Sequence, residues 1–330
     1  TPKPSSAASD VYKRQVYMSH VYVLVEHDAD KVLPVTGELI TAARELGTVS
    51  AVVVGKQADK FDADLAALGA AQVVQATAED YDQRFLTPEV DALHALGAAN
   101  PAPIVLAATP ANNEIAGRLA ARLASGALVN VDAIAADGSV QMTIFGGSYE
   151  TTSTAAGQCP IYTLRPGAVE TAPQQVEAQP APMPLPAATG KDVKVTSFTP
   201  AQKSARPEIT EAKAVVAGGR GVGNEFSTVV EPLADALGAA VGATRDAVDE
   251  GFYDAAYQIG QTGVTVTPDL YIGLGISGAI QHTSGMQTSG TIVVVNQDQD
   301  EPFFQIADLG VVGDLHEIAP ALTEELKARQ

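Results

Sequence analysis

The chain has 330 residues, of which 46% are hydrophobic, so it can form two domains with substantial cores. A formal net charge of −19 makes nucleic acids and anionic membrane surfaces poor partners, because both require a concentrated positive surface. The single cysteine, Cys159, excludes an internal disulfide framework and any metal site built from several cysteines. No apolar run is long enough to cross a bilayer, so we do not expect an integral membrane protein.

Residues 1–17 are rich in Ser, Ala and Pro and lack the apolar segment of a signal peptide. We interpret them as a remnant of cloning or gene prediction, and we expect the natural chain to begin at Met18.

From Met18 onward, short apolar strands alternate with helical patterns, which is typical of a parallel sheet flanked by helices. The expected strands are 21–25, 49–54, 72–74 and 104–107, and the expected helices are 39–46, 62–68, 88–96 and 113–123. Residues 108–113 can serve as a helix cap or as a ligand-binding turn at the end of a strand. We therefore place an N-terminal α/β domain at 18–165.

After 127–131 the pattern changes, because the expected strands at 141–145 and 161–165 have no helix between them. This indicates an antiparallel edge or a β excursion that closes the first domain. Residues 166–208 are then rich in Pro, Ala, Gln and Glu, which favours a linker or an extended crossing segment.

A second α/β unit is expected over 209–330. A strand at 214–217 leads into the glycine-rich residues 218–223, and helical spacing follows from 226 to 237 with Pro232 inside it. Because proline cannot continue a helix without a kink, that helix either bends or starts late. Further strands are expected at 270–276 and 291–295, a short apolar pair at 303–306 and a terminal helix at 318–326.

The segment 268–282 carries the most informative polar residues of this unit. It predicts a buried strand, a glycine turn and a helix capped by Ser277, whose first-turn N–H groups can face an anion. Gln281 and His282 then fall in the second turn of that helix. An ordinary strand, turn and helix of an α/β core would have the same pattern.

Two arginines lie in positions that suit a negatively charged ligand. Arg220 lies inside the glycine-rich turn, where a phosphate can approach the backbone. The spacing of these glycines and the lack of a suitably placed acidic residue argue against a standard NAD fingerprint. Thr244 looks like a helix cap followed by Arg245, a cation that opposes the helix dipole. Either a bound anion or a surface pair with Asp249 explains Arg245.

These motifs together resemble the α subunit of electron transfer flavoprotein, in the order and spacing of that family. The motifs are 218–221 (GGRG), 242–245 (GATR), 260–263 (GQTG), 275–282 (GISGAIQH) and 295–296 (VN). The similarity is most specific over 270–296, extends to 108–131, and covers nearly everything from Met18. The family commonly has Ser at the position of Thr244, which keeps the hydroxyl group, and different small residues at Gly273 and Val294.

The resemblance implies a Rossmann-like C-terminal domain that binds FAD in an extended form. It also implies a β subunit that completes a heterodimer, contacts the N-terminal domain at 18–165 and carries AMP. The cofactor contacts that it implies are Arg220, Thr244, Arg245, Ile259, Gly260, Gln261, Thr262, Ser277, Gly278, Ala279, Ile280, Gln281, His282, Asn296, Asp314 and Leu315. We hypothesise that Arg245 stabilises the anionic flavin, with His282 near the pyrimidine carbonyl and Thr262 near N5.

In such proteins the flavin carries single electrons from flavoprotein dehydrogenases of the acyl-CoA dehydrogenase type to a membrane quinone oxidoreductase or a respiratory chain, with no metal. The compartment implied is the cytoplasm of a bacterium or the mitochondrial matrix of a eukaryote. Two alternatives remain: a regulatory subunit that holds an adenine nucleotide without redox chemistry, and a nitrogen-fixation or bifurcating member of the same family. An NAD-linked oxidoreductase is disfavoured because the sequence has no convincing acid–base pair.

Overall fold

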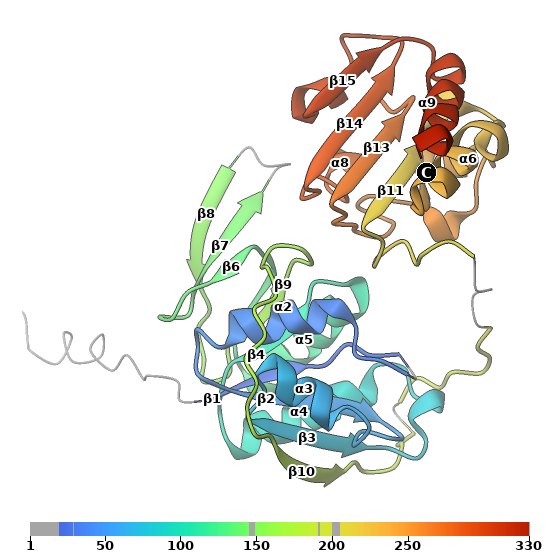
Figure 1. Cartoon of the computed structure of the whole chain (residues 1–330). Helices are drawn as coiled ribbons and strands as arrows, with labels where there is room; N and C mark the ends of the chain where they lie inside the picture. Colours follow the sequence, from blue (N-terminus) through green and yellow to red (C-terminus); the bar gives the residue numbers. More distant parts are fainter. Residues whose placement is uncertain (1–19, 29, 145–148, 191, 200–204, 330) are drawn as a thin grey trace, which may run out of the picture. The chain divides into compact units, whose positions relative to one another are not determined.

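The computed structural model describes residues 20–28, 30–144, 149–190, 192–199 and 205–329. Residues 1–17 and the expected start at Met18 lie outside this part. The chain divides into two compact units after Thr199. Each unit is a parallel sheet with helices on its faces (Figure 1), so the predicted α/β class with two domains is confirmed. Within the described ranges, no helix is both long and apolar enough to cross a bilayer.

The first unit is built on a parallel sheet of seven strands in the order β10-β3-β2-β1-β4-β9-β5. Its strands are β1 (His20–Leu24), β2 (Thr48–Gly55), β3 (Gln72–Thr77), β4 (Ile104–Ala107), β5 (Ala127–Val131), β9 (Ile161–Leu164) and β10 (Gln179–Pro184). Its helices are α2 (Pro34–Ala43), α3 (Asp62–Leu68), the 3-10 turn η1 (Tyr81–Gln83), α4 (Thr87–Ala99) and α5 (Pro110–Leu123).

Both faces of this sheet are covered. Leu39 of α2 and Leu65 of α3 pack into the core on one face, and Leu93 of α4 and Leu119 of α5 pack into the core on the other. This explains why the strands are continuous apolar runs rather than alternating ones.

Residues 133–184 follow the prediction only in part. A separate antiparallel sheet of β6 (Ala133–Ile134), β7 (Ser139–Ile144) and β8 (Tyr149–Thr154) is the expected β excursion. In contrast, β9 lies inside the main sheet, parallel to β4 and β5, so it is not an antiparallel edge. The predicted linker 166–208 contributes β10, which pairs with β3 through 179–184, and the first unit reaches Thr199 rather than Arg165.

The second unit has a parallel sheet of five strands in the order β12-β11-β13-β14-β15. Its strands are β11 (Ala214–Gly218), β12 (Ala240–Ala243), β13 (Leu270–Leu274), β14 (Thr291–Asn296) and β15 (Leu309–Val312). Its helical segments are η2 (Arg220–Val222), η3 (Phe226–Val230), α6 (Glu231–Leu237), α7 (Arg245–Asp249), η4 (Ala255–Tyr257), α8 (Ile280–Thr283), η5 (Pro302–Ile306) and α9 (Leu315–Arg329). Leu233 of α6 and Ala319 of α9 share the core on one face of the sheet, and Phe303 packs on the other.

Pro232 has the effect that its position suggested. The chain from Phe226 to Val230 forms a π-helical turn, and the regular helix α6 starts at Glu231 with Pro232 as its second residue. A proline is tolerated there because the first N–H groups of a helix have no partner within it. Of the two alternatives, the helix therefore starts late.

Candidate functional site

The sheet of the second unit has its topological switch point between β11 and β13. The chain passes from β11 to β12 on one side, and the next strand, β13, pairs with the other side of β11. In open parallel sheets, ligands bind in the crevice at the carboxyl ends of such a pair of strands. A cavity of about 550 Å³ lies here, lined by the turns that follow both strands.

The turns after β11 and β13 approach each other too closely for side chains between them. The Gly219 N–H donates to the Leu274 carbonyl at 2.9 Å, and the Gly221 N–H donates to the Gly275 carbonyl at 3.2 Å. A Cβ atom on residue 219 would lie 2.2 Å from the Gly275 carbonyl oxygen. Backbone contact therefore requires glycine at 219, and the two turns form one wall of the cavity.

The structure brings most of the predicted residues together around this cavity. Those that line it are Arg220, Thr244, Arg245, Ile259, Thr262, Ser277, Ala279, Gln281, His282, Asn296 and Leu315. The predicted residues outside the lining are Gly260, Gln261, Gly278, Ile280 and Asp314. The lining residues that sequence reasoning missed are Gly221, Asp246, Gln258, Gly275, Ile276, Gln297, Glu301 and His316. All of the missed residues except Glu301 lie within two positions of a predicted one, so adjacency in the chain was the available signal.

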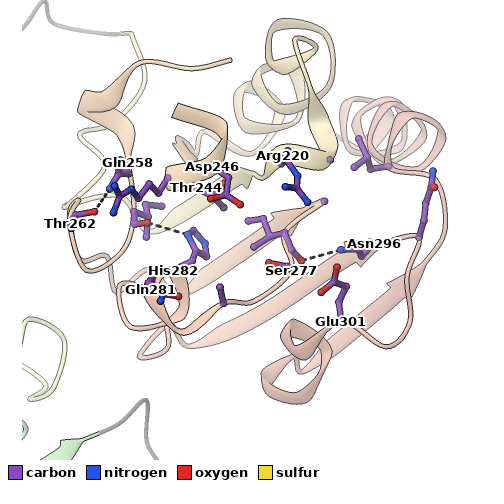
Figure 2. Close-up of a pocket in the computed structure, with 18 of the residues that line it drawn as sticks. Arg220, Thr244, Asp246, Gln258, Thr262, Ser277, Gln281, His282, Asn296 and Glu301 are labelled. Carbon is purple, nitrogen blue, oxygen red and sulfur yellow. Dashed lines mark hydrogen bonds between the residues drawn. The ribbon is translucent and has the colours of Figure 1, made fainter. Parts of the chain in front are cut away.

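One part of the cavity offers positive charge together with free backbone donors. Figure 2 shows Arg220 and Ser277 on the two turns, with Asn296 beside Ser277. Within the part of the chain that the structure describes, the backbone N–H groups of Ser277, Gly278 and Ala279 have no hydrogen-bond acceptor. Free amides close to a guanidinium group suit an anion such as a phosphate.

Ser277 does not cap a helix, and this prediction was wrong. The helix α8 begins at Ile280, and Gln281 and His282 consequently lie in its first turn rather than its second. Gly278 has a φ of 87°, a left-handed conformation, and a Cβ added there would lie 2.4 Å from the backbone nitrogen of Phe303. The chain therefore turns once more before the helix can begin.

Thr244 caps α7 as predicted, because its Oγ1 accepts the Ala247 N–H at 3.3 Å. Arg245 follows as the first helical residue, and its Nε lies 3.2 Å from Oδ2 of Asp249. The two side chains are 60% and 64% exposed, so this pair is solvated and weak. The alternative of a surface pair with Asp249 is thus seen in the structure, while Arg245 also lines the cavity together with Asp246.

His282 is buried and fully hydrogen bonded within the chain. Its Nε2 lies 2.7 Å from the hydroxyl of Tyr271, and its Nδ1 lies 3.1 Å from the Ile259 carbonyl oxygen. Burial lowers the pKa of His282 to about 4, and the bond to Ile259 offsets this only in part. The ring is therefore uncharged at neutral pH, and both of its nitrogens are bonded within the chain.

The loop between η4 and β13 carries Thr262 to the cavity. The Thr262 hydroxyl accepts from Gln258 Nε2 at 2.8 Å (Figure 2), and both residues line the cavity, as His282 does. The Gln261 N–H donates to the Gln281 carbonyl at 2.8 Å, which joins the loop to α8. Gly260 and Gln261 thus hold the loop in place, although neither lines the cavity.

The remaining predicted residues support the far wall. Asn296 Nδ2 donates to the Ile276 carbonyl at 3.1 Å, which links the end of β14 to the turn after β13. Asp314 Oδ1 accepts the His316 N–H at 2.9 Å at the start of α9, so Asp314 orders the helix rather than lining the cavity. Leu315 is buried and gives this wall an apolar surface.

The second unit is thus a doubly wound α/β domain whose switch-point cavity combines a glycine-rich turn, two arginines and free amides, the features of a binding domain for a phosphate-bearing cofactor. Residues 208–287 match the family model described as the electron transfer flavoprotein FAD-binding domain, and residues 21–214 match that of the electron transfer flavoprotein domain. The chain belongs to the family of electron transfer flavoprotein α subunits.

Three relatives illustrate how far the similarity extends. Electron transfer flavoprotein subunit alpha of Mycobacterium leprae is 50% identical over 95% of this chain and all of its own length. The protein of the same name from Mycobacterium tuberculosis is 51% identical, with the same coverage. The mitochondrial protein of Dictyostelium discoideum is 37% identical over 94% of this chain and 92% of its own.

Proposed function

We propose that this chain is the α subunit of a heterodimeric electron transfer flavoprotein and that the cavity of its second unit holds FAD. The observation that carries the proposal is the position of the cavity, at the switch point of the segment that matches an FAD-binding domain. Its volume of about 550 Å³ lies in the usual range for cofactor sites. The free N–H groups of 277–279 near Arg220 fit the diphosphate of such a dinucleotide.

The residues of the chain would divide the work of holding the cofactor. FAD supplies reversible one-electron chemistry when bound. Arg220 and the turn amides would neutralise the diphosphate, and Leu315 and Ile259 would cover apolar parts of the ligand. Arg245 adds a positive charge that favours a reduced, anionic flavin, whereas His282 contributes no charge. Thr262 lines the cavity and would offer a hydroxyl group to the flavin.

The proposed partners follow from the family and from the names of the relatives. We infer a β subunit that completes the site and carries AMP, and we infer electron transfer from flavoprotein dehydrogenases of fatty acid β-oxidation to a membrane quinone oxidoreductase or a respiratory chain. The compartment would be the cytoplasm, or the mitochondrial matrix in a eukaryote. The partner chain would decide whether the protein instead serves nitrogen fixation or electron bifurcation.

The test is the visible absorption spectrum of the full chain purified with a candidate β subunit. We expect flavin bands, one FAD per complex after release by heat, and bleaching on stepwise reduction. A colourless complex that also refuses added FAD would contradict the proposal and favour the regulatory nucleotide-binding alternative.

Arg118→Ala is a matched comparison for Arg220→Ala, because Arg118 is a partly exposed arginine in the first unit that pairs with Glu114. Loss of a charge-assisted contact to a phosphate should weaken FAD binding about tenfold or more, measured by fluorescence titration. If the Arg220→Ala variant bound FAD as tightly as the wild-type protein, Arg220 would not contact the cofactor. Arg118→Ala should leave the affinity for FAD unchanged.

A further inference from the structure

A completely buried tyrosine lies behind the wall of the cavity that His282 provides. Tyr271 of β13 has no exposed surface, and its hydroxyl oxygen lies 2.7 Å from His282 Nε2. The ring of His282 also meets Phe303 edge-on, with 6.1 Å between ring centres. Tyr271 itself is not in the lining of the cavity. Tyr271 therefore contacts His282, which lines the cavity, and does not itself face the cavity.

The hydrogen bonds of the His282 ring determine where its proton lies. A carbonyl oxygen can only accept, so Nδ1, which bonds to the Ile259 carbonyl at 3.1 Å, must carry a proton. The Tyr271 hydroxyl needs an acceptor in its buried place, and Nε2 is the acceptor within reach. Nε2 is therefore unprotonated and accepts the hydroxyl proton.

The reverse arrangement, with both nitrogens protonated, would bury a charge without a counter-ion. Within the described part of the chain, the ring contacts the Tyr271 hydroxyl of β13, the Ile259 carbonyl of the loop before β13, and the Phe303 ring of η5. None of these groups carries a negative charge at neutral pH, and an unpaired buried charge is costly.

We infer that Tyr271 is a positioning residue, which fixes His282 as the uncharged tautomer with its proton on Nδ1, so that the imidazole faces the cavity without an N–H group to donate. The inference rests on the proposed function for its meaning at the flavin, and it bears on the hypothesis that His282 lies near the pyrimidine carbonyl. With both nitrogens bonded inside the chain, His282 cannot also donate to a pyrimidine carbonyl. Its ring instead ties α8 to the loop that carries Thr262, and so places both residues in the cavity wall.

The test is nitrogen NMR of the full chain labelled with ¹⁵N in its histidines, of which there are five. The His282 signals are assigned as those lost in His282→Gln. In the wild-type chain we expect one protonated nitrogen and one unprotonated nitrogen, unchanged from about pH 8 to about pH 5. In Tyr271→Phe, loss of the bond that favours the neutral ring should move the midpoint of His282 titration upward by about one pH unit.

Tyr162→Phe is the matched control, because Tyr162 is equally buried and donates its hydroxyl to the Gly138 carbonyl in the first unit. It should leave the His282 signals unchanged. A proton on Nε2 in the wild-type chain, or a midpoint that Tyr271→Phe does not move, would overturn the inference. These readouts need no bound flavin, so they stay valid if the chain fails to bind FAD and the proposed function falls. A flavin complex in which His282 is charged would sink the inference and leave the proposed function standing.

Discussion

The two units share one architecture and differ at their switch points. In the second unit, the turns after β11 and β13 contain glycines whose backbones are in contact. A cavity lies beside these two turns. In the first unit the switch point lies between β1 and β4, because β2 pairs with one side of β1 and β4 with the other. Here the chain bridges the two strands with its own side chains.

Glu26, which follows β1, and Asn112, in the first turn of α5, form this bridge. Asn112 is 4% exposed, and its Nδ2 donates to Glu26 Oε1 at 2.7 Å and to the Ala107 carbonyl at 3.0 Å. The cap alternative for 108–113 is thus the one that the structure shows, since Thr109 Oγ1 accepts the Asn112 N–H at 3.1 Å. The comparison shows that the sheet topology creates a crevice at the switch point of each unit. The residues of the turns then decide whether side chains fill that crevice or leave a cavity.

The largest expected effect comes from placing a methyl group in the glycine wall of the second unit. Gly219→Ala would put a Cβ 2.2 Å from the Gly275 carbonyl oxygen, and neither partner is a flexible side-chain end that could move away. We expect a loss of about 3 kcal/mol or more in unfolding free energy, measured in urea, and loss of FAD binding.

Gly117→Ala is the control for that substitution, since an added Cβ there meets no heavy atom within 4 Å. It lies in α5 of the first unit, where alanine is the better helix former, so we expect a gain of up to about 1 kcal/mol. If Gly219→Ala were as stable as Gly117→Ala, close packing of the two turns would not be what shapes the second switch point.

A smaller loss is expected from removing the bridge in the first unit. Asn112→Ala deletes both bonds of Nδ2 and leaves the Glu26 carboxyl group without its donor, which should cost about 2 kcal/mol in urea unfolding. FAD affinity should not change, because the site lies in the other unit. Asn112→Asp should be more damaging at neutral pH, since it faces Glu26 with a second carboxylate. An Asp variant that is more stable than the Ala variant would show that Glu26 and Asn112 do not interact.

The sequence was sufficient for features that depend on local pattern. Most of the expected strands and helices and the Thr244 cap follow from short-range rules, and the structure confirms them. Pro232 left a bend and a late start of α6 open, and the structure shows the late start. The resemblance predicted most of the residues that line the cavity, because its motifs lie on the turns that the sheet brings together. Whether these residues contact a cofactor stays a prediction.

Features that depend on distant parts of the chain could not be predicted in this way. β10 is a proline-rich segment that pairs at a sheet edge, where missing N–H groups are tolerated. Whether Ser277 or a later residue begins α8 depends on the packing of Gly278 against Phe303, 25 positions further on. The partner of His282 Nε2 is Tyr271 on the preceding strand, and only the tertiary fold brings the two together.

The smallest effect concerns the charge of Glu26, and its sign depends on pH. Burial raises the pKa of Glu26, and the hydrogen bond from Asn112 lowers it by less. The folded chain therefore holds this proton more tightly than the unfolded chain, so the contribution of Glu26 to stability falls as pH rises from near 4.5 through the folded pKa.

Glu26→Gln stays neutral and keeps an oxygen that can accept from Asn112. Relative to the wild-type protein it should gain about 1 kcal/mol at pH 8 and nothing near pH 4, measured by urea unfolding at both values. An equal gain at both pH values would show that the change in side-chain shape, and not the charge of Glu26, sets the difference in unfolding free energy. A loss confined to pH 8 would show that the ionised Glu26 carboxylate stabilises the folded chain.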